Sequence, residues 1–183
     1  MPAEEKEVVN PRIISEGHIL YTFNCDDIYI QNALNYIVAG VKKGESVLVI
    51  ESSRNIPRLR EHLVTLLDEK ERNRIHYTNN FTFYTLNGAF HASKVLNYFC
   101  RIVKELTEKE GKFRLWTHVE WGDEEEFLNN IEEYEQSSDE IIRAEQLLCV
   151  CAYREKNISS ELKQTLLQFH SHEMSDKDLL TLE

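Results

Sequence analysis

The sequence predicts a three-layer α/β fold, with a mostly parallel central sheet and helices on both of its faces. Strand-like segments alternate at least four times with segments of helical periodicity. The runs at residues 47–50 (VLVI) and 147–152 (LLCVCA) are continuously apolar, which is typical of strands buried on both sides. Right-handed crossovers would place the intervening helices on the two faces.

The first half of the chain is expected to contain two strands and two helices. HILYTF at residues 18–23 predicts the first strand, and apolar residues at helical spacing predict a helix over 28–41. The strand at 47–50 follows. Pro57 then stands in the first turn of a second helix, where its missing N–H is tolerated.

The second half is less regular at its start. Residues 75–86 hold two short strand candidates, IHYT and FTFYTL, which could form either a hairpin or a strand followed by a loop. A third helix has its apolar residues between 92 and 106 and ends at Gly111. A fourth helix begins at Asp123, and the serines at 137–138 mark a candidate break in it.

We expect one α/β domain over residues 16–172, completed by the strand at 147–152 and a fifth helix around 162–169. A flexible arm at 1–15 and a polar tail at 173–183 are expected to flank it. With 183 residues, of which 42% are hydrophobic, the chain is long enough to bury a sizeable core.

Composition argues against several kinds of partner. The net charge of −11 disfavours nucleic acid and anionic membranes, since both require clustered basic residues. No apolar run approaches the roughly 20 residues of a membrane span, and the charged residues 1–10 do not resemble a signal peptide. We therefore expect a cytoplasmic protein whose four irregularly spaced cysteines are reduced.

The segment 112–121 (KFRLWTHVEW) is the most informative strand candidate. Because side chains alternate along a strand, one face carries Phe113, Leu115, Thr117 and Val119, and the other carries Arg114, Trp116, His118 and Glu120. A mixed face of this kind is unusual between helical segments, where both faces are normally apolar. A site is therefore expected where this strand turns into the next helix.

Ligands of open α/β sheets bind outside the carboxyl ends of the parallel strands, which share one edge. Polar and aromatic residues follow several of the predicted strands at that edge, and two more lie on the mixed strand face. The candidate ligand-binding residues are Asn24, Asp27, Glu51, Ser52, Arg114, His118, Glu120, Trp121 and Tyr153.

Nucleotide-binding signatures are absent from the sequence. No GxxxxGK[ST], GxGxxG or GxSxG motif occurs, and the turn at residues 24–27 contains no glycine that would let backbone amides close on a phosphate. Asp26 and Asp27 in that turn would repel an anion. The sequence therefore predicts that ATP does not bind tightly.

Two further groups of residues could carry chemistry. Cys149 and Cys151 would share a strand face, but zinc normally takes four ligands and no second pair follows, so we favour small buried side chains without a metal or cofactor. Oxidation sensing stays open, since it depends on exposure. His118, Glu120 and the histidines at 170–172 could form a metal or acid–base site, but nothing brings them together in sequence, and a structural role is favoured.

The order of several short segments resembles the MEDS family of sensory domains from methanogens and methylotrophs. The segments are HILY, GESVLVI, FRLWTHVEW, Tyr134-Glu135, Cys151-Ala152-Tyr153 and His170. The resemblance spans roughly residues 15–172. It implies a RecA/KaiC-like fold that has lost the phosphate-binding loop, and a role in sensing rather than in catalysis.

By this resemblance the positions that matter are Arg114, Glu120, Trp121, Tyr134, Glu135 and Tyr153. The chain departs from the family in two respects: it leaves no room for a DNA-binding or kinase domain, and Arg154 stands where an acidic residue is expected. The implied partners are therefore a separate regulatory protein (a kinase or a transcription regulator), a small-molecule ligand, or a second copy of the chain.

Two functions follow from these observations. The first is a non-enzymatic sensory or regulatory module that binds a small molecule, a partner signalling protein, or both. The alternative is a small-molecule hydrolase or transferase that uses His118 and Glu120 in the strand-end crevice.

Overall fold

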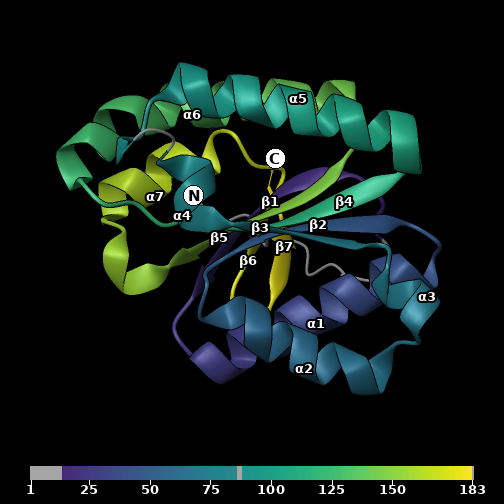
Figure 1. Ribbon diagram of the computed structural model, residues 1–183. Coiled ribbons are helices and arrows are strands. Elements are labelled where there is room, and N and C mark those ends of the chain that lie inside the picture. The colour runs from purple at the N-terminus through teal and green to yellow at the C-terminus, as the bar shows by residue number, and fades with distance from the viewer. Residues whose placement is uncertain (1–13, 86–87, 183) are drawn as a thin grey trace.

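The computed structural model describes residues 14–85 and 88–182, and its centre is a seven-stranded sheet (Figure 1). Six strands run parallel, and only the edge strand β7 is antiparallel to its neighbour. In spatial order the strands are β3 (Ile75–Asn79), β2 (Ser46–Glu51), β4 (Phe113–His118), β5 (Leu148–Arg154), β1 (Gly17–Phe23), β6 (His172–Met174) and β7 (Leu179–Thr181).

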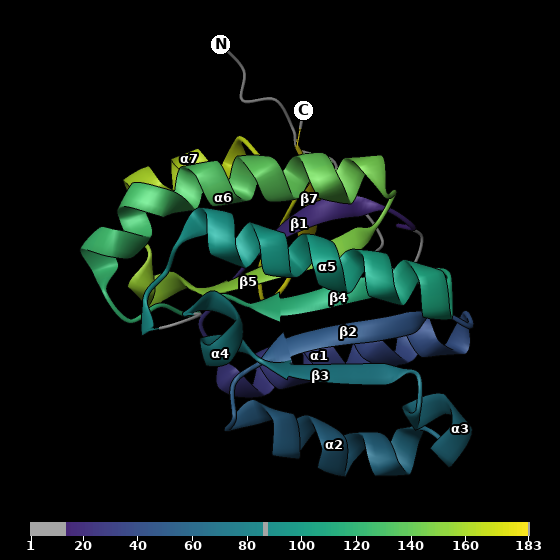
Figure 2. The ribbon, with the colours of Figure 1, turned by 45° about the horizontal axis from the view of Figure 1, so that its top comes forward.

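Helices cover both faces of the sheet, as Figures 1 and 2 show. One face, which we call the α1 face, is covered by α1 (Asp26–Lys42), α2 (Asn55–Leu66) and α3 (Glu69–Arg72). The opposite α6 face is covered by α4 (Asn80–Tyr84), α5 (Ala92–Glu110), α6 (Glu124–Ala144) and α7 (Ser160–Leu167). The predicted three-layer α/β fold is therefore confirmed.

The side chains of β4 alternate between the two faces as the sequence predicts. Leu115 packs in the apolar core of the α6 face, whereas Trp116 packs in the core of the α1 face. Both are fully buried, because β4 has a parallel neighbour on each side and helices above and below. The polar residues of this strand are consequently held inside the protein.

Residues 75–79 form β3, and the short helix α4 follows at once, so no hairpin forms over the described part of 75–86. The side chain of Asn79 starts α4 by accepting a hydrogen bond from the Thr82 amide at 3.0 Å. The serines at 137–138 do not break the fourth helix. α6 continues past them, and Ser138 is buried.

The C-terminal residues differ from the polar tail expected over 173–183. β6 pairs in parallel with β1, and β7 pairs with β6, so this segment extends the sheet. Strands of three residues are too short to produce a recognisable alternating pattern, which is why the sequence did not indicate them. The arm expected at 1–15 lies outside the described residues except for Ile14 and Ser15.

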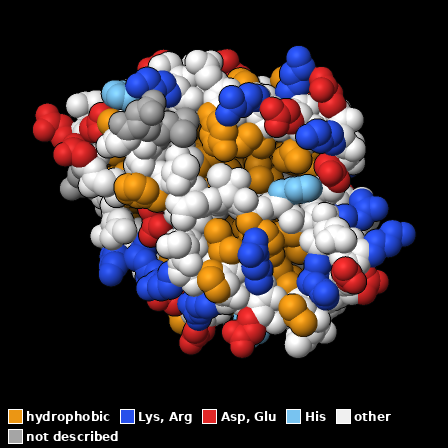
Figure 3. Space-filling model, in the orientation of Figure 1, with side chains coloured by type: hydrophobic (Ala, Val, Ile, Leu, Met, Phe, Trp, Pro, Cys, Tyr) orange, Lys and Arg blue, Asp and Glu red, His pale blue; other side chains and the backbone are white. Residues whose placement is uncertain are grey.

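The surface is mixed in character. On the face drawn in Figure 3, Lys and Arg are interspersed with Asp and Glu, and apolar side chains reach the surface between them. Exposed large apolar residues include Val64 and Leu66 on α2 and Phe81 on α4. Within the described residues, no helix has the length and apolar character needed to cross a membrane.

Candidate functional site

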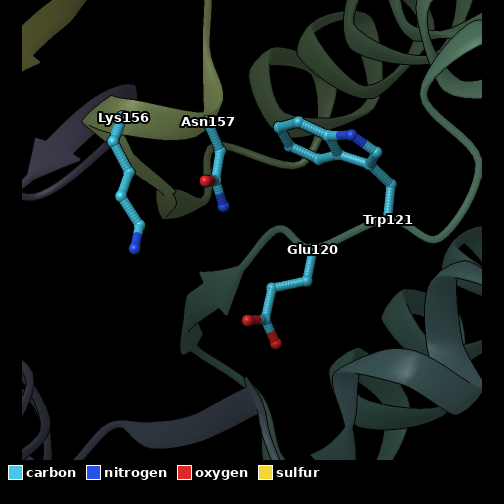
Figure 4. Close-up of a pocket in the computed structure, with 4 residues that line it drawn as sticks. All are labelled: Glu120, Trp121, Lys156 and Asn157. Carbon is cyan, nitrogen blue, oxygen red and sulfur yellow. The ribbon is translucent and has the colours of Figure 1, made fainter.

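Polar residues gather at the carboxyl ends of the parallel strands, where β2 ends at Glu51 and β4 at His118. Just beyond β4 and β5 lies a pocket of about 340 Å³, lined by Glu120, Trp121, Lys156 and Asn157. In Figure 4, Asn157 extends between Lys156 and the ring of Trp121, and Glu120 lies across from them. The pocket thus presents an anion, a cation, an amide and an aromatic surface.

The two β4-side residues of the pocket are held by different means. The Trp121 ring stacks on Phe127 of α6 with centroids 4.1 Å apart, which fixes one wall. The Glu120 side chain is 47% exposed, and Asn80 Nδ2 donates to its Oε2 at 2.8 Å. The same Asn80 amide donates to the His118 backbone carbonyl at 3.0 Å. Glu120 is therefore oriented but still open to solvent.

Beneath the pocket a buried chain of hydrogen bonds leads into the α1 face. His118 Nδ1 lies 2.7 Å from Glu51 Oε1, while its Nε2 lies 3.7 Å from Glu120 Oε1. The Tyr29 hydroxyl donates to Glu51 Oε2 and accepts from Trp116 Nε1 at 2.9 Å. Glu120 thus lies within electrostatic reach of His118, which is hydrogen-bonded to a carboxylate in the core.

Glu51 is held as an anion although it is fully buried. Burial works against its charged form, but the hydrogen bond and charge of His118, together with Tyr29 and the Ser52 amide, outweigh this and lower its pKa. Burial raises the pKa of Tyr29 well above its usual value, and the neighbouring Glu51 charge adds to the effect. Tyr29 therefore stays a hydroxyl donor to Glu51.

Four other predicted residues lie around this edge without lining the pocket. The Asn24 side chain donates to Glu155, which directly precedes Lys156. Asp27 is exposed and lies 3.4 Å from Arg58, and the Ser52 hydroxyl accepts the amide of Asn55, the first residue of α2, at 3.2 Å. Tyr153 faces the α6 face, where its hydroxyl donates to Glu135 and its ring lies 6.3 Å from Trp121.

Arg114 is the one predicted site residue near the amino end of its strand, β4, whereas the candidate site lies at the carboxyl ends of the strands. It lies four residues before His118, about 13 Å away along β4. Its Nε donates to Glu45 Oε2 at 2.5 Å, and its guanidinium lies over the Tyr36 ring. A Cβ at Gly40 would come within 2.7 Å of Arg114 Cδ, so the glycine leaves room for it. A shared strand face places Arg114 and His118 on one side of the sheet but not at one edge.

Asp176, in the turn between β6 and β7, is an unpredicted residue at the strand-end edge. Its Oδ2 accepts the backbone amides of Asn24 and Cys25 at 3.0 Å each, and its Oδ1 accepts the Tyr21 hydroxyl at 2.7 Å. These amides precede α1, where a phosphate would sit in a nucleotide-binding protein. The Asp176 carboxylate thus accepts the backbone hydrogen bonds that a bound phosphate would otherwise accept.

Replacing Asp176 with Ala is expected to lower the free energy of unfolding by about 2–3 kcal/mol, because three donors lose a charged acceptor. The melting temperature should fall by about 4–12 °C for a chain of this length. Asp178→Ala, in the same turn and exposed, is the matched control and should change stability by less than about 0.5 kcal/mol. Equal melting temperatures for the two variants would contradict the anchoring role of Asp176.

Two of the four pocket residues were missed from the sequence. Lys156 and Asn157 belong to the 3-10 turn η2 (Glu155–Asn157), which directly follows β5. The signal was their position four and five residues past the end of the strand predicted at 147–152. A second, larger depression of about 470 Å³ lies at the opposite edge, where Ser15, Lys112 and Leu147 precede their strands. Because ligands of parallel sheets bind at the carboxyl edge, we take the first pocket as the candidate site.

His118 and His170, which could both be metal ligands by residue type, lie on opposite faces of the sheet. His118 is on the α1 face beside Glu51, whereas His170 is on the α6 face 3.8 Å from the ring of His18. The structure therefore does not bring them into one site.

Comparisons with known proteins agree with this architecture. The family model described as "MEDS: MEthanogen/methylotroph, DcmR Sensory domain" matches residues 17–171. A KaiC-like protein from the hyperthermophilic archaeon Pyrococcus horikoshii OT3 is similar in structure, with a TM-score of 0.56 and 15% identity over 87% of this chain and 70% of that one. A second protein from the same organism has a TM-score of 0.54 and 9% identity, over 90% and 85% of the two chains. At these identities the likeness shows the fold alone. None of the curated proteins matches the sequence at a significant level.

Proposed function

The chain belongs to the MEDS family of sensory domains, and on that premise we propose that it is a non-enzymatic regulatory module that binds a small polar molecule in the strand-end pocket. It then acts in the cytoplasm through a partner protein. The observation that carries the proposal is the pocket itself. Glu120, Lys156, Asn157 and Trp121 converge there from segments that follow β4 and β5.

The lining of the pocket defines the ligand class. Glu120 favours a cationic or hydrogen-bond-donating group, and Lys156 favours an anion. Asn157 can donate to and accept from the ligand, while the Trp121 ring offers an apolar surface. A pocket of about 340 Å³ suits a small metabolite that carries groups of both polarities.

The buried chain beneath the pocket provides a route by which ligand binding reaches the core. A ligand that pairs with Glu120 changes the charge facing His118 Nε2, which lies 3.7 Å away. His118 in turn contacts Glu51 and, through it, Tyr29 of α1. We propose that this route alters the surface presented to a kinase, a transcription regulator or a second copy of the chain.

The alternative, a hydrolase or transferase that uses His118 and Glu120, has less support. His118 is only 3% exposed and is held between Glu51 and Glu120. Among the described residues, those that line the pocket are Glu120, Trp121, Lys156 and Asn157, so a substrate there would not meet the His118 ring.

The proposal is tested by capture of ligands from a deproteinised cell extract. The purified protein is mixed with the extract and separated from free molecules by gel filtration, and the bound compounds are released and identified by mass spectrometry. We expect Trp121→Ala to retain about tenfold less of the captured compound than the wild type, a loss of about 1.4 kcal/mol of binding. Leu66→Ala, which removes an exposed apolar side chain on α2, should retain as much as the wild type.

Glu120→Gln separates binding from folding in the same assay, because it keeps the shape of the side chain and removes its charge. Since Glu120 is half exposed, the melting temperature of the variant should stay within about 4 °C of that of the wild type, while the amount of captured ligand falls. Glu61→Gln, on the exposed face of α2, is the control for loss of a charge. A large loss of stability with unchanged capture, or the absence of any captured compound, would contradict the proposed function.

A further inference from the structure

A second polar cluster lies on the α6 face, apart from the strand-end pocket. It consists of His18 on β1, Cys151 on β5, Glu135 on α6 and His170, which follows α7. All four side chains are buried. They come from elements as far as 152 positions apart in sequence and meet only in the folded protein. Such a group is costly to bury unless its polar atoms are satisfied.

The side-chain atoms of the cluster have the spacing of a metal's ligand shell. His18 Nε2 lies 3.2 Å from Cys151 Sγ and 3.5 Å from Glu135 Oε2, and His170 Nε2 lies 3.7 Å from the same Oε2. One atom from each residue lies within 4.8 Å of all the others. A tetrahedral zinc ion with bonds of about 2.0–2.3 Å separates its ligands by about 3.3–3.8 Å. The three separations given above fall within or close to this range.

Both histidines are oriented as metal ligands are. His18 Nδ1 faces the Phe169 carbonyl at 2.9 Å, and His170 Nδ1 faces the Leu166 carbonyl at 2.6 Å. A carbonyl only accepts, so each Nδ1 carries a proton, and each Nε2 points into the cluster, where it would bind a metal ion once it is unprotonated. Asp139 Oδ1, 3.3 Å from His18 Nδ1, adds a carboxylate behind the ring. This arrangement of outer partners is typical of metal-bound histidine.

Two of the four converging atoms have no hydrogen-bond partner in the structure. Glu135 Oε2 and His170 Nε2 are both buried, and both are without a donor. They face each other as two acceptors, since His170 Nε2 is unprotonated in this tautomer. A buried carboxyl oxygen and a buried imidazole lone pair in contact require either a proton or a metal cation between them.

We propose that His18 Nε2, His170 Nε2, Cys151 Sγ and Glu135 Oε2 bind one divalent zinc ion. Nitrogen, sulfur and carboxylate oxygen in four-coordinate geometry form a donor set that zinc accepts. Zinc displaces the proton of the Cys151 thiol, and the thiolate and the Glu135 carboxylate then balance its two charges. With four protein ligands and no solvent access the site is structural, joining β1, β5, α6 and the segment after α7.

The site also contacts the wall of the strand-end pocket. Glu135 Oε1 accepts a hydrogen bond from the Tyr153 hydroxyl, and the centroids of the Tyr153 and Trp121 rings are 6.3 Å apart. Cys149 lies on the same strand face, with its Sγ 3.9 Å from Cys151 Sγ, but it is not part of the four-residue group. The sequence did not indicate this site, because the three ligands other than Cys151 come from different elements and not from a second cysteine pair.

The test uses the full chain stripped of metal by a chelator and then titrated with Co²⁺ and Zn²⁺. We expect one Zn²⁺ per chain with a Kd below about 1 μM. Co²⁺ should give the near-ultraviolet charge-transfer band of a bound thiolate. Zn²⁺ should raise the melting temperature of the protein, because it binds only the folded state. Cys151→Ala should weaken binding by at least about 100-fold and abolish the band.

Cys149→Ala is the matched control and should keep both the affinity and the band. Glu135→Gln should weaken zinc binding but keep the thiolate band at high Co²⁺. If Cys151→Ala does not fold, the Co²⁺ spectrum and the zinc stoichiometry of the wild type alone test the site. A wild-type Kd above about 10 μM, a Co²⁺ complex without the thiolate band, or equal loss of binding in both cysteine variants would overturn the site.

Discussion

Replacing Glu51 with Gln is expected to lower the free energy of unfolding by about 3–5 kcal/mol and the melting temperature by about 6–20 °C. Glu51 is fully buried and accepts hydrogen bonds from the Tyr29 hydroxyl, the Ser52 amide and Asn55 Nδ2. The NH₂ group of a glutamine amide would face one of these three groups, so that two hydrogen-bond donors would meet without an acceptor. It would also leave His118 Nδ1 without its carboxylate partner.

The pH dependence of this loss follows from the lowered pKa of Glu51. The folded-state pKa is below the unfolded value of about 4.5, so the unfolded chain binds more protons between the two values. The contribution of Glu51 is therefore fully present above pH 4.5 and is lost as the pH falls through its folded pKa. Thermal melts of wild type and Glu51→Gln should differ most at neutral pH and converge in acid. A constant difference down to pH 3 would contradict the ionised state of Glu51.

Replacing Arg114 with Met is expected to cost a similar 3–5 kcal/mol or so, because it leaves the buried Glu45 carboxylate without its closest partner. Glu45 has a second partner, Lys112 Nζ at 3.9 Å, whose side chain is 58% exposed. Arg114 also packs on the Tyr36 ring, and this contact is lost with the guanidinium. The expected fall in melting temperature is about 6–20 °C.

Lys112→Met is the matched control, since it removes the exposed partner of the same carboxylate. It should cost no more than about 1 kcal/mol. Ligand capture by Arg114→Met should match the wild type at temperatures where the variant is folded, because Arg114 lies at the far end of β4. Loss of ligand capture with unchanged stability would show instead that Arg114 contributes to the ligand site. Calorimetric or optical melts in parallel with the capture assay separate the two outcomes.

The fold could be predicted because its signals are local. Continuous apolar runs mark the strands that are buried on both sides, such as β2, and helical periodicity marks the segments between them. The segment at 75–86 remained open because a short apolar run fits a strand or a helix equally well, and α4 has only five residues. β6 and β7 have three residues each, and only pairing with β1 makes them strands.

The candidate site could be predicted in part because parallel strands share an edge. Glu120 and Trp121 were found by their place after β4, and the same rule extended a few residues past β5 indicates Lys156 and Asn157. Arg114 was misplaced because period-2 alternation gives the face of a residue and not its position along the strand.

Contacts between distant segments could not be predicted from one sequence. Asp176 reaches the amides of Asn24 and Cys25 across 152 and 151 positions of the chain. The buried cluster of His18 and Cys151 spans 133 positions, and each of its residues alone fits an ordinary core role. Only the folded chain brings these groups to within hydrogen-bond distance.

The proposed function requires the pocket beyond β4 and β5 to be the ligand site of this sensory module. The most direct measurement is a crystal structure of the protein equilibrated with the compound recovered by capture from the extract. We expect electron density for that compound between Glu120, Lys156 and Trp121, with its polar groups on the carboxylate and the ammonium. Density at the depression beside Lys112, or at the turn of Asn24 and Cys25 with Asp176 displaced, would contradict it.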